Sequence, residues 1–134
     1  MQLIRLSEKF YQKYGDLPEI LKKDGRPYAY LEVEIDGFRF AIPFRHNIIH
    51  KYAFFTYGKA GLDYTKAVVI EDWDMVDPFA PRIEQKEFDF IKGKEHLIES
   101  GMRRYYKLLK NAKRYSTNQN YSNILAFSAL KYFI

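Results

Sequence analysis

The stretch YAYLEVEIDGFRFAIPF, residues 28–44, decides the fold of this chain. It consists of two runs rich in aromatic and β-branched residues, joined by an Asp-Gly pair that suits a tight primed turn. In the first run Glu32 and Glu34 alternate with apolar residues, which is typical of a strand that buries one face. The stretch therefore predicts a β-hairpin. We expect its second strand to end or kink at Pro43, because proline has no N–H to donate to a neighbouring strand.

The other predicted elements lie on both sides of this hairpin. Strands are expected at residues 3–6, 53–57 and 66–73, a turn at 58–63, and helices at 7–15, 17–23, 84–112 and 122–133. Gly93 and Gly101 predict interruptions of the long helical region. A helix, then antiparallel strands, then helices is the order typical of the α+β class. We therefore expect a single domain, residues 1–134, with N-terminal and C-terminal helices packed around a twisted antiparallel sheet.

The composition narrows the class of protein. With 134 residues, twelve Tyr and eleven Phe, the chain has the length and the apolar surface of one folded domain. No run of about 18 apolar residues is present, and the N-terminal segment lacks the apolar region of a signal peptide, so we expect a soluble cytoplasmic protein without a membrane partner. The absence of cysteine excludes disulfides, thiolate catalysis and most structural zinc sites.

Positive charge is concentrated in the C-terminal third. The net charge is +5, and residues 86–134 hold 10 basic but only 4 acidic side chains. In the segment MRRYYKLLKNAKR, residues 102–114, helical spacing places apolar side chains opposite a basic stripe, which consists of Arg103, Lys107, Lys110 and Arg114. The stripe is either an ordinary solvated face or a surface that follows nucleic-acid phosphates. The lack of acids in this segment favours phosphate binding.

The segment RHNIIHK, residues 45–51, holds two of the three histidines in the chain. Three interpretations of His46 and His50 are open. They could share a helix face and bind a metal, although no carboxylate lies between Arg45 and Asp63 to complete a zinc site. They could be ordinary surface or packed histidines. One of them could instead transfer a proton during phosphodiester cleavage, with the neighbouring cations stabilising negative charge on phosphorus.

Two weaker signals lie further along the chain. Thr65 and Lys66 stand where the strand 66–73 is expected to begin, a position at which a lysine is usually an exposed cap. Asp72 and Asp74 could bind Mg²⁺ as acidic clusters do in nucleases. Their alternation with apolar residues at a strand end instead favours a solvated edge. We therefore expect neither a metal site nor a cofactor.

Four segments, taken in order, resemble a known family of toxins. They are IRLSEKFYQKY, LEVEIDGFRFAIPFRH, GLDYTKAVVI and NILAFSALKYF. Their order and nearly equal spacing resemble the endoribonuclease toxins of type III toxin–antitoxin systems, the ToxN/AbiQ group, and are most similar to its CptN and TenpN members. The resemblance covers most of the chain. It implies the broad fold of the Kid and MazF toxins, an antiparallel sheet with the curl of an SH3-like barrel and added helices.

The resemblance also implies roles for individual residues and a partner. In ToxN-like members an aromatic hydroxyl in the first helix, a lysine before the hairpin and a hydroxyl pair after it line the active groove. Here the lysine position falls on Arg26, and the pair falls on Arg45 and His46. The aromatic position falls on Phe10, so Tyr11 would supply the hydroxyl. The implied inhibitor is a repeated RNA pseudoknot, held in basic grooves of a closed protein–RNA assembly.

These observations together predict a metal-independent endoribonuclease. A histidine would take the proton of a ribose 2′-hydroxyl, which then attacks the adjacent phosphate and leaves a 2′,3′-cyclic phosphate and a 5′-hydroxyl. The catalytic candidates are His46, His50, Tyr11, Arg26, Arg45 and Lys66. The RNA-binding candidates are Asn47, Lys51, Thr65, Arg103, Arg104, Lys107, Lys110 and Arg114.

DNA lacks the 2′-hydroxyl and is not an expected substrate. The alternatives are a non-catalytic RNA-binding module that uses the same basic helix, and an α+β domain whose basic helix docks on an acidic protein.

Overall fold

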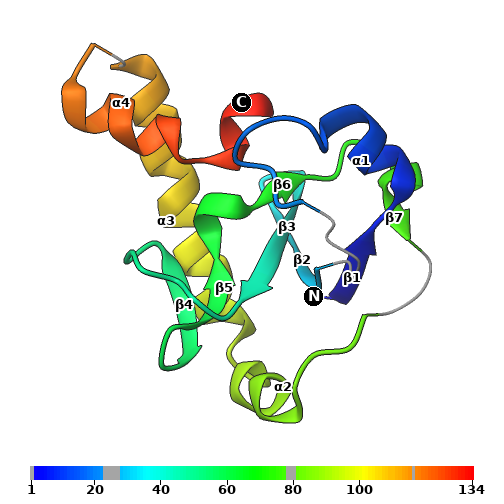
Figure 1. The fold of residues 1–134 in the computed structure, drawn as a ribbon. Helices are drawn as coiled ribbons and strands as arrows, with labels where there is room; N and C mark the ends of the chain where they lie inside the picture. The colour runs from blue at the N-terminus through cyan, green and yellow to red at the C-terminus, as the bar shows by residue number, and fades with distance from the viewer. Residues whose placement is uncertain (1, 23–27, 78–80, 116) are drawn as a thin grey trace.

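The computed structural model describes residues 2–22, 28–77, 81–115 and 117–134. Within these ranges the chain forms a seven-stranded antiparallel sheet and four α-helices, so the expected α+β class is confirmed (Figure 1). The strands are β1 (Gln2–Leu6), β2 (Tyr30–Ile35), β3 (Phe38–Arg45), β4 (Ala53–Tyr57), β5 (Ala60–Asp63), β6 (Val68–Val69) and β7 (Val76–Asp77). The helices are α1 (Glu8–Tyr14), α2 (Gln85–Ile91), α3 (Glu95–Arg114) and α4 (Gln119–Ala126).

The sheet is built around β3. On one edge β3 pairs with β2 from Phe38 to Pro43. On its other edge it changes neighbours, because its first half pairs with the short β6 whereas Phe44 and Arg45 pair with β5. The order β4-β5-β3-β2-β1-β7 leaves an open sheet with β4 and β7 at its ends. Figure 1 shows the β4–β5 hairpin at one end of the molecule and α1 beside β7 at the other.

The predicted hairpin is confirmed, but its second strand does not end at Pro43. Asp36 and Gly37 both have positive φ, 52° and 84°, as a primed turn requires. The N–H of Phe44 donates to the carbonyl of Ala29 on the β2 side, at 3.0 Å. The nitrogen of Pro43 therefore faces the opposite edge, in the gap where β6 has ended and β5 has not begun. The missing N–H leaves no bond unmade there, so the strand continues to Arg45.

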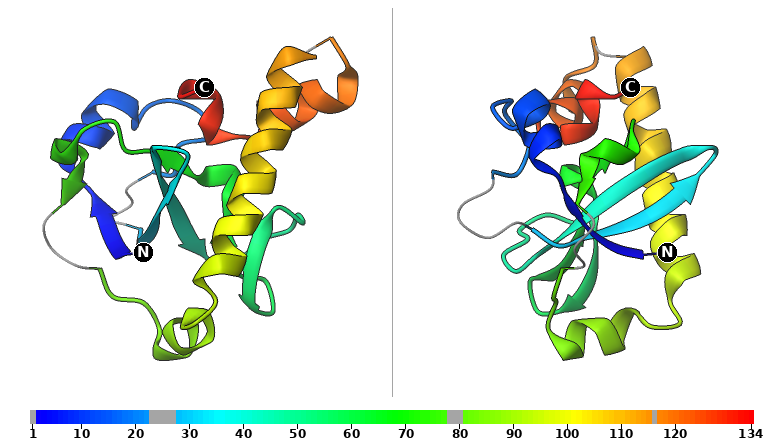
Figure 2. Two further views of the ribbon diagram at one scale, coloured as in Figure 1. Left: turned by 180° about the vertical axis from the view of Figure 1, so that it is seen from behind. Right: turned by 90° about the vertical axis from the view of Figure 1, so that its right-hand side faces the viewer.

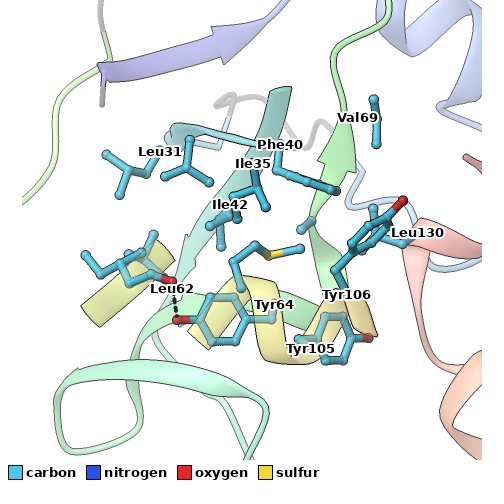
Figure 3. Packing of buried hydrophobic residues seen from close by; sticks show 14 of the residues in the cluster. Leu31, Ile35, Phe40, Ile42, Leu62, Tyr64, Val69, Tyr105, Tyr106 and Leu130 are labelled. Carbon is cyan, nitrogen blue, oxygen red and sulfur yellow. Dashed lines mark hydrogen bonds between the residues drawn. The ribbon is translucent and has the colours of Figure 1, made fainter. Parts of the chain in front are cut away.

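Both faces of the sheet are covered. On one face Val33 and Ile42 belong to a core that includes Met102 and Leu109 of α3, which runs along that side of the sheet (Figure 2). Figure 3 shows Tyr64, Tyr105 and other members of this core between the strands and α3. On the other face Tyr30 packs in a second cluster with Phe10 of α1. Helix α3 thus covers one face of the sheet and α1 covers the other, as expected of helices packed around the sheet.

Several local predictions in the first two thirds of the chain need correction. Residues 17–20 form turns and bends, and residues 21–22 are irregular, so no helix forms there. Glu19 has a φ of 74°, which lies outside the helical range. The predicted turn at 58–63 contains β5. Of the predicted strand at 66–73 only Val68–Val69 is a strand, and Lys66 belongs to a 3-10 turn, Tyr64–Lys66.

The C-terminal helices also differ from expectation. Gly101 does not interrupt α3, which is continuous over 20 residues. A Cβ added at Gly101 would lie 2.3 Å from the hydroxyl oxygen of Tyr64, so the glycine allows the tyrosine to pack against the helix. There the Tyr64 hydroxyl donates to the carbonyl of Ile98, at 3.0 Å. The last predicted helix is divided into α4 and a 3-10 turn, Ala129–Tyr132, which Ser128 caps.

Candidate functional site

Two hollows meet at Arg45, at the end of β3. The larger, which we call the wide groove, has a volume of ≈ 680 Å³. It is lined by Tyr28, Ala29, Phe44, Arg45, His46, Asn47, Arg82, Ile83, Glu84 and Glu87. The smaller, which we call the apolar pocket, has a volume of ≈ 330 Å³. It is lined by Arg45, His50, Tyr52, Thr65, Lys66, Tyr105, Asn123, Ile124 and Phe127.

Asp63 holds Arg45 and His50 in place. Its carboxylate is completely buried at the end of β5. One oxygen accepts from Nη1 of Arg45, at 2.8 Å. The other accepts from the backbone N–H of Thr65 at 2.9 Å and from its hydroxyl at 2.6 Å, and lies 3.1 Å from Nε2 of His50. A buried carboxylate needs such a set of donors and a balancing cation, so Asp63 fixes the direction of the Arg45 side chain.

Both ring nitrogens of His50 are occupied. Nδ1 accepts the backbone N–H of Tyr52, at 3.0 Å, so the proton of the neutral ring lies on Nε2. Nε2 faces Asp63 and also lies 3.3 Å from the Thr65 hydroxyl. A protonated nitrogen cannot accept the threonine proton, so this group does not activate Thr65 as a nucleophile. In this geometry neither nitrogen is left to take a proton from a substrate.

His46 has a different environment, in the wide groove. Its side chain is 58% exposed, and its Nε2 lies 3.3 Å from a carboxylate oxygen of Glu87, whose side chain is 1% exposed. The second oxygen of Glu87 accepts from the Thr56 hydroxyl at 3.4 Å. Glu84 lies 3.9 Å from the same Nε2 and also accepts from the Tyr57 hydroxyl. With Nε2 directed at a buried carboxylate, Nδ1 is the ring nitrogen that remains available to a ligand.

Glu87 is a residue that the sequence analysis missed. It lies on α2, 41 positions from His46 in the chain. A signal was present, because Glu87 is four residues before the buried Ile91 and so lies on the buried face of α2. A glutamate on a buried helix face needs a partner, and the partners here are His46 and Thr56.

The remaining catalytic candidates are dispersed. Lys66 forms an ion pair with Glu19 and donates to the carbonyl of Phe127, at 3.2 Å, so it lines the apolar pocket and not the wide groove. Tyr11 lies on α1, where burial raises the pKa of its hydroxyl and a hydrogen bond with Tyr30 partly offsets that effect. The hydroxyl is therefore protonated at neutral pH. Arg26 lies outside the described residues.

The RNA-binding candidates form separate groups. Asn47 lines the wide groove beside His46. Lys51 and Arg104 line a third hollow of ≈ 230 Å³. Tyr52 and Tyr105 line both this hollow and the apolar pocket.

The basic stripe is exposed on α3, as predicted, but it is not free of acids. Arg103 pairs with Asp36 of the hairpin turn, at 2.8 Å. Lys110 and Arg114 line a further hollow of ≈ 370 Å³ with Tyr106. Lys107 is also exposed. The segment 102–114 itself lacks acids, but Asp36, 67 positions from Arg103 in the chain, places a carboxylate beside the stripe.

Asp72 and Asp74 lie at the molecular edge with Lys9. Asp74 pairs with the Lys9 ammonium at 2.9 Å, and Asp72 lies 3.8 Å from it. Asp72 also caps the 3-10 turn Trp73–Met75. Across the ranges that the structure describes, no three histidine or carboxylate side chains are grouped as metal ligands. None of the described helices is long and apolar enough to cross a membrane.

Comparisons of the chain with protein-family models, with curated proteins and with solved structures found no match. The geometry of the two hollows and the resemblance carried by the four segments are therefore the observations that bear on function.

Proposed function

We propose that this chain is a metal-independent endoribonuclease, the toxin of a type III toxin–antitoxin system similar to the CptN and TenpN members of the ToxN/AbiQ group. The observation that carries the proposal is His46 of the wide groove, exposed to solvent and held through Nε2 by the buried Glu87. A histidine oriented by a carboxylate through one nitrogen is arranged to exchange a proton at the other. Arg45, next to it in sequence, supplies fixed positive charge beside the same groove.

The proposed reaction is an internal transesterification. His46 takes the proton of a ribose 2′-hydroxyl at Nδ1, and the 2′ oxygen forms a bond to the adjacent phosphorus. The bond from phosphorus to the 5′ oxygen breaks, and that oxygen leaves with a proton from water. The products are a 2′,3′-cyclic phosphate and a 5′-hydroxyl. Glu87 holds the imidazole and stabilises the imidazolium that forms, while Arg45 offsets the charge that develops on phosphorus.

The other predicted residues contribute to the proposed activity to different extents. Asn47 and Arg82 share the groove with His46 and would contact the RNA backbone. Arg26 retains the role that the resemblance implies. Lys66 lines the apolar pocket and not the wide groove, so it contributes less. His50 positions the Arg45–Asp63 pair. Tyr11 remains a catalytic candidate, with its hydroxyl in the protonated form.

The proposal extends to the partner and to the curl of the sheet. The inhibitor would be a repeated RNA pseudoknot that contacts the cations of α3 and Lys51 in a closed protein–RNA assembly. The sheet would correspond to that of the Kid and MazF toxins, with β5 replacing β6 beside β3 as the point where it curls. DNA would not be a substrate, because it has no 2′-hydroxyl.

The non-catalytic RNA-binding module remains the second candidate, and one observation favours it. Lys51 lies over the Tyr52 ring, 5.4 Å from its centroid, and shares a hollow with Arg104 and Tyr105. Cations beside aromatic rings are typical of single-stranded RNA binding. However, a surface that only binds phosphates has no use for a buried carboxylate directed at a histidine, which favours the enzyme.

The decisive experiment is cleavage of a mixed-sequence RNA in excess EDTA. We expect cleavage to persist, with 2′,3′-cyclic phosphate and 5′-hydroxyl ends identified by phosphatase and kinase treatment. The same sequence with 2′-deoxyribose should stay intact. RNA that is bound but not cut would support the binding module, and activity that requires Mg²⁺ would contradict the proposed chemistry and direct attention to Asp72 and Asp74.

A further inference from the structure

The apolar pocket adjoins the wide groove but has a different character. Its walls are mostly carbon, contributed by the rings of Tyr52 and Tyr105 and by Ile124 and Phe127. The Tyr105 hydroxyl donates to Ser128, at 2.8 Å, so this residue offers the pocket its ring and not its polar end. Tyr52 and Tyr105 lie next to one another, with ring centroids 5.7 Å apart. The pocket is thus a space with aromatic walls.

Most polar side chains around this pocket already have partners. His50 and Thr65 are bound to Asp63, and Lys66 is bound to Glu19 and a backbone carbonyl. Asn123 of α4 accepts from the Gln119 amide through Oδ1, at 3.1 Å, so its own NH₂ group remains as a donor on the pocket wall. A ligand in this pocket would therefore be recognised by flat apolar contact and a few hydrogen bonds.

Arg45 connects the pocket to the groove. It lines both hollows, and only its Nη1 is used by Asp63, so other guanidinium N–H groups remain for an anion. A ligand that fits this arrangement has a flat body for the pocket and a negative charge at Arg45. A nucleotide has both parts, and a volume of ≈ 330 Å³ lies at the small end of ligand sites, as suits one base.

We propose that the apolar pocket receives the base of the RNA nucleotide whose phosphate lies at Arg45, and that it selects the sequence at which RNA is cut. The base stacks on the aromatic wall, as bases do in single-stranded RNA sites. The Asn123 amide donates to an acceptor on the base edge, so the four bases bind with different affinities. In naming RNA as the ligand, the inference rests on the proposed function.

The test uses mononucleotides, which report on the pocket without any cleavage. Nucleoside 3′-monophosphates of all four bases are titrated into the whole chain by calorimetry, with ribose 5-phosphate as the ligand that lacks a base. Ile124→Trp fills the pocket. Ser122→Trp, at an exposed position of the same helix, places the same indole outside it.

We expect Ile124→Trp to weaken the best mononucleotide by about tenfold or more, roughly the value of one stacked base, while Ser122→Trp leaves its affinity unchanged. Circular dichroism and thermal unfolding establish that both variants are folded. If Ile124→Trp does not fold, Asn123→Leu at an exposed position serves instead, with an expected change in the rank order of the four bases. Equal affinity for ribose 5-phosphate and the nucleotides, or an unchanged rank order, would overturn the inference.

The two proposals fail in different ways. If the wild-type chain cuts RNA but Ile124→Trp alters neither mononucleotide affinity nor the preferred cleavage sequence, the base pocket is refuted and the nuclease stands. If the wild-type chain cuts no RNA but the filled pocket loses mononucleotide affinity, the pocket stands as a nucleotide-binding site, and both the nuclease and the selection of a cleavage sequence are refuted.

Discussion

His46 and His50 lie four positions apart but differ in whether a ring nitrogen is left to act on a substrate. The difference arises from their carboxylate partners, since Glu87 takes one nitrogen of His46, whereas Asp63 and the Tyr52 amide take both nitrogens of His50. We therefore expect His46→Ala and His50→Ala to have unequal effects, although their positions in the sequence give no reason to distinguish them.

His46→Ala should reduce the RNA cleavage rate by roughly 10²- to 10⁴-fold, the usual contribution of a positioned proton-transfer group. RNA affinity should change little, because phosphate contacts are spread over many cations. His50→Ala should retain most of the activity but lower the free energy of unfolding by about 1–2 kcal/mol, because the Tyr52 amide loses its acceptor. Single-turnover cleavage and urea unfolding measure the two effects. Full activity of both variants would contradict a histidine mechanism.

Glu87→Gln keeps the size of the side chain but removes the charge that stabilises an imidazolium at His46. We expect kcat to fall by about tenfold or more with KM nearly unchanged, because the lost interaction strengthens only as positive charge develops on the His46 ring in the transition state. Glu84→Gln, at the N-cap position of α2, is the matched control, since Glu84 lies 3.9 Å from the ring and its side chain is half exposed. Equal losses in both variants would mean that general charge, and not the buried carboxylate, affects His46.

At the scale of elements, α3 has two functions. Its buried face packs against the sheet through residues such as Met102 and Leu109, and its outer face presents the basic stripe. Gly101 and Arg103 lie two positions apart on these different faces, and each is explained by a residue distant in sequence: Tyr64 for the glycine and Asp36 for the arginine.

Gly101→Ala should destabilise the protein, although alanine alone favours a helix by about 1 kcal/mol over glycine. The new methyl group would displace Tyr64 and break its hydrogen bond to Ile98, at a net cost of about 1–3 kcal/mol. Ser100→Ala, at the exposed neighbouring position, is the control and should be neutral or slightly stabilising. Urea unfolding distinguishes the two, and a more stable Gly101→Ala chain would show that the Tyr64 contact has no importance.

Replacing Lys107, Lys110 and Arg114 together by Gln should weaken RNA binding and reduce its dependence on salt. The slope of log affinity against log salt should fall by about 0.7 for each lost phosphate contact on single-stranded RNA. Arg103→Gln alone should change the slope less, because Asp36 already neutralises Arg103. Lys92→Gln, an exposed cation at the end of α2, is the control. An unchanged slope in the triple variant would return the stripe to a solvated face.

At the scale of the whole molecule, tyrosines form much of the core and make stability sensitive to alkaline pH. Burial raises the pKa of Tyr64 to about 12, and burial likewise raises the pKa of Tyr30 and Tyr105. A tyrosine in the unfolded chain has a pKa of about 10. The folded state therefore holds these protons more tightly, and the stability linked to them is present below pH 10 and lost as pH rises toward 12.

Each such tyrosine should reduce the free energy of unfolding by about 1.4 kcal/mol per pH unit in this range. Urea unfolding between pH 9 and pH 11.5, with tyrosinate absorbance recorded in parallel, measures the slope. Tyr64→Phe should make the slope shallower by about one group. A stability that does not change above pH 10 would contradict the linkage.

The sequence by itself determined the features that depend on neighbours in the chain. The hairpin at residues 28–44 follows from alternation and an Asp-Gly turn, α1 follows from a Ser7 cap, and the exposed face of α3 follows from a 3.6-residue period. These patterns are local, so they can be identified without knowledge of the fold.

Only the tertiary structure decided which side chains meet. Asp63 is 18 positions from Arg45, Glu87 is 41 from His46, and Tyr64 lies against Gly101, a glycine whose position had predicted a helix break. The sequence predicts a turn where β5 forms, because the strand character of β5 depends on its pairing with β3 and β4. The physical reason is the same in each case. Burial and hydrogen bonding act between groups that folding brings together, and a local sequence pattern does not identify the distant group that will pair with a given side chain.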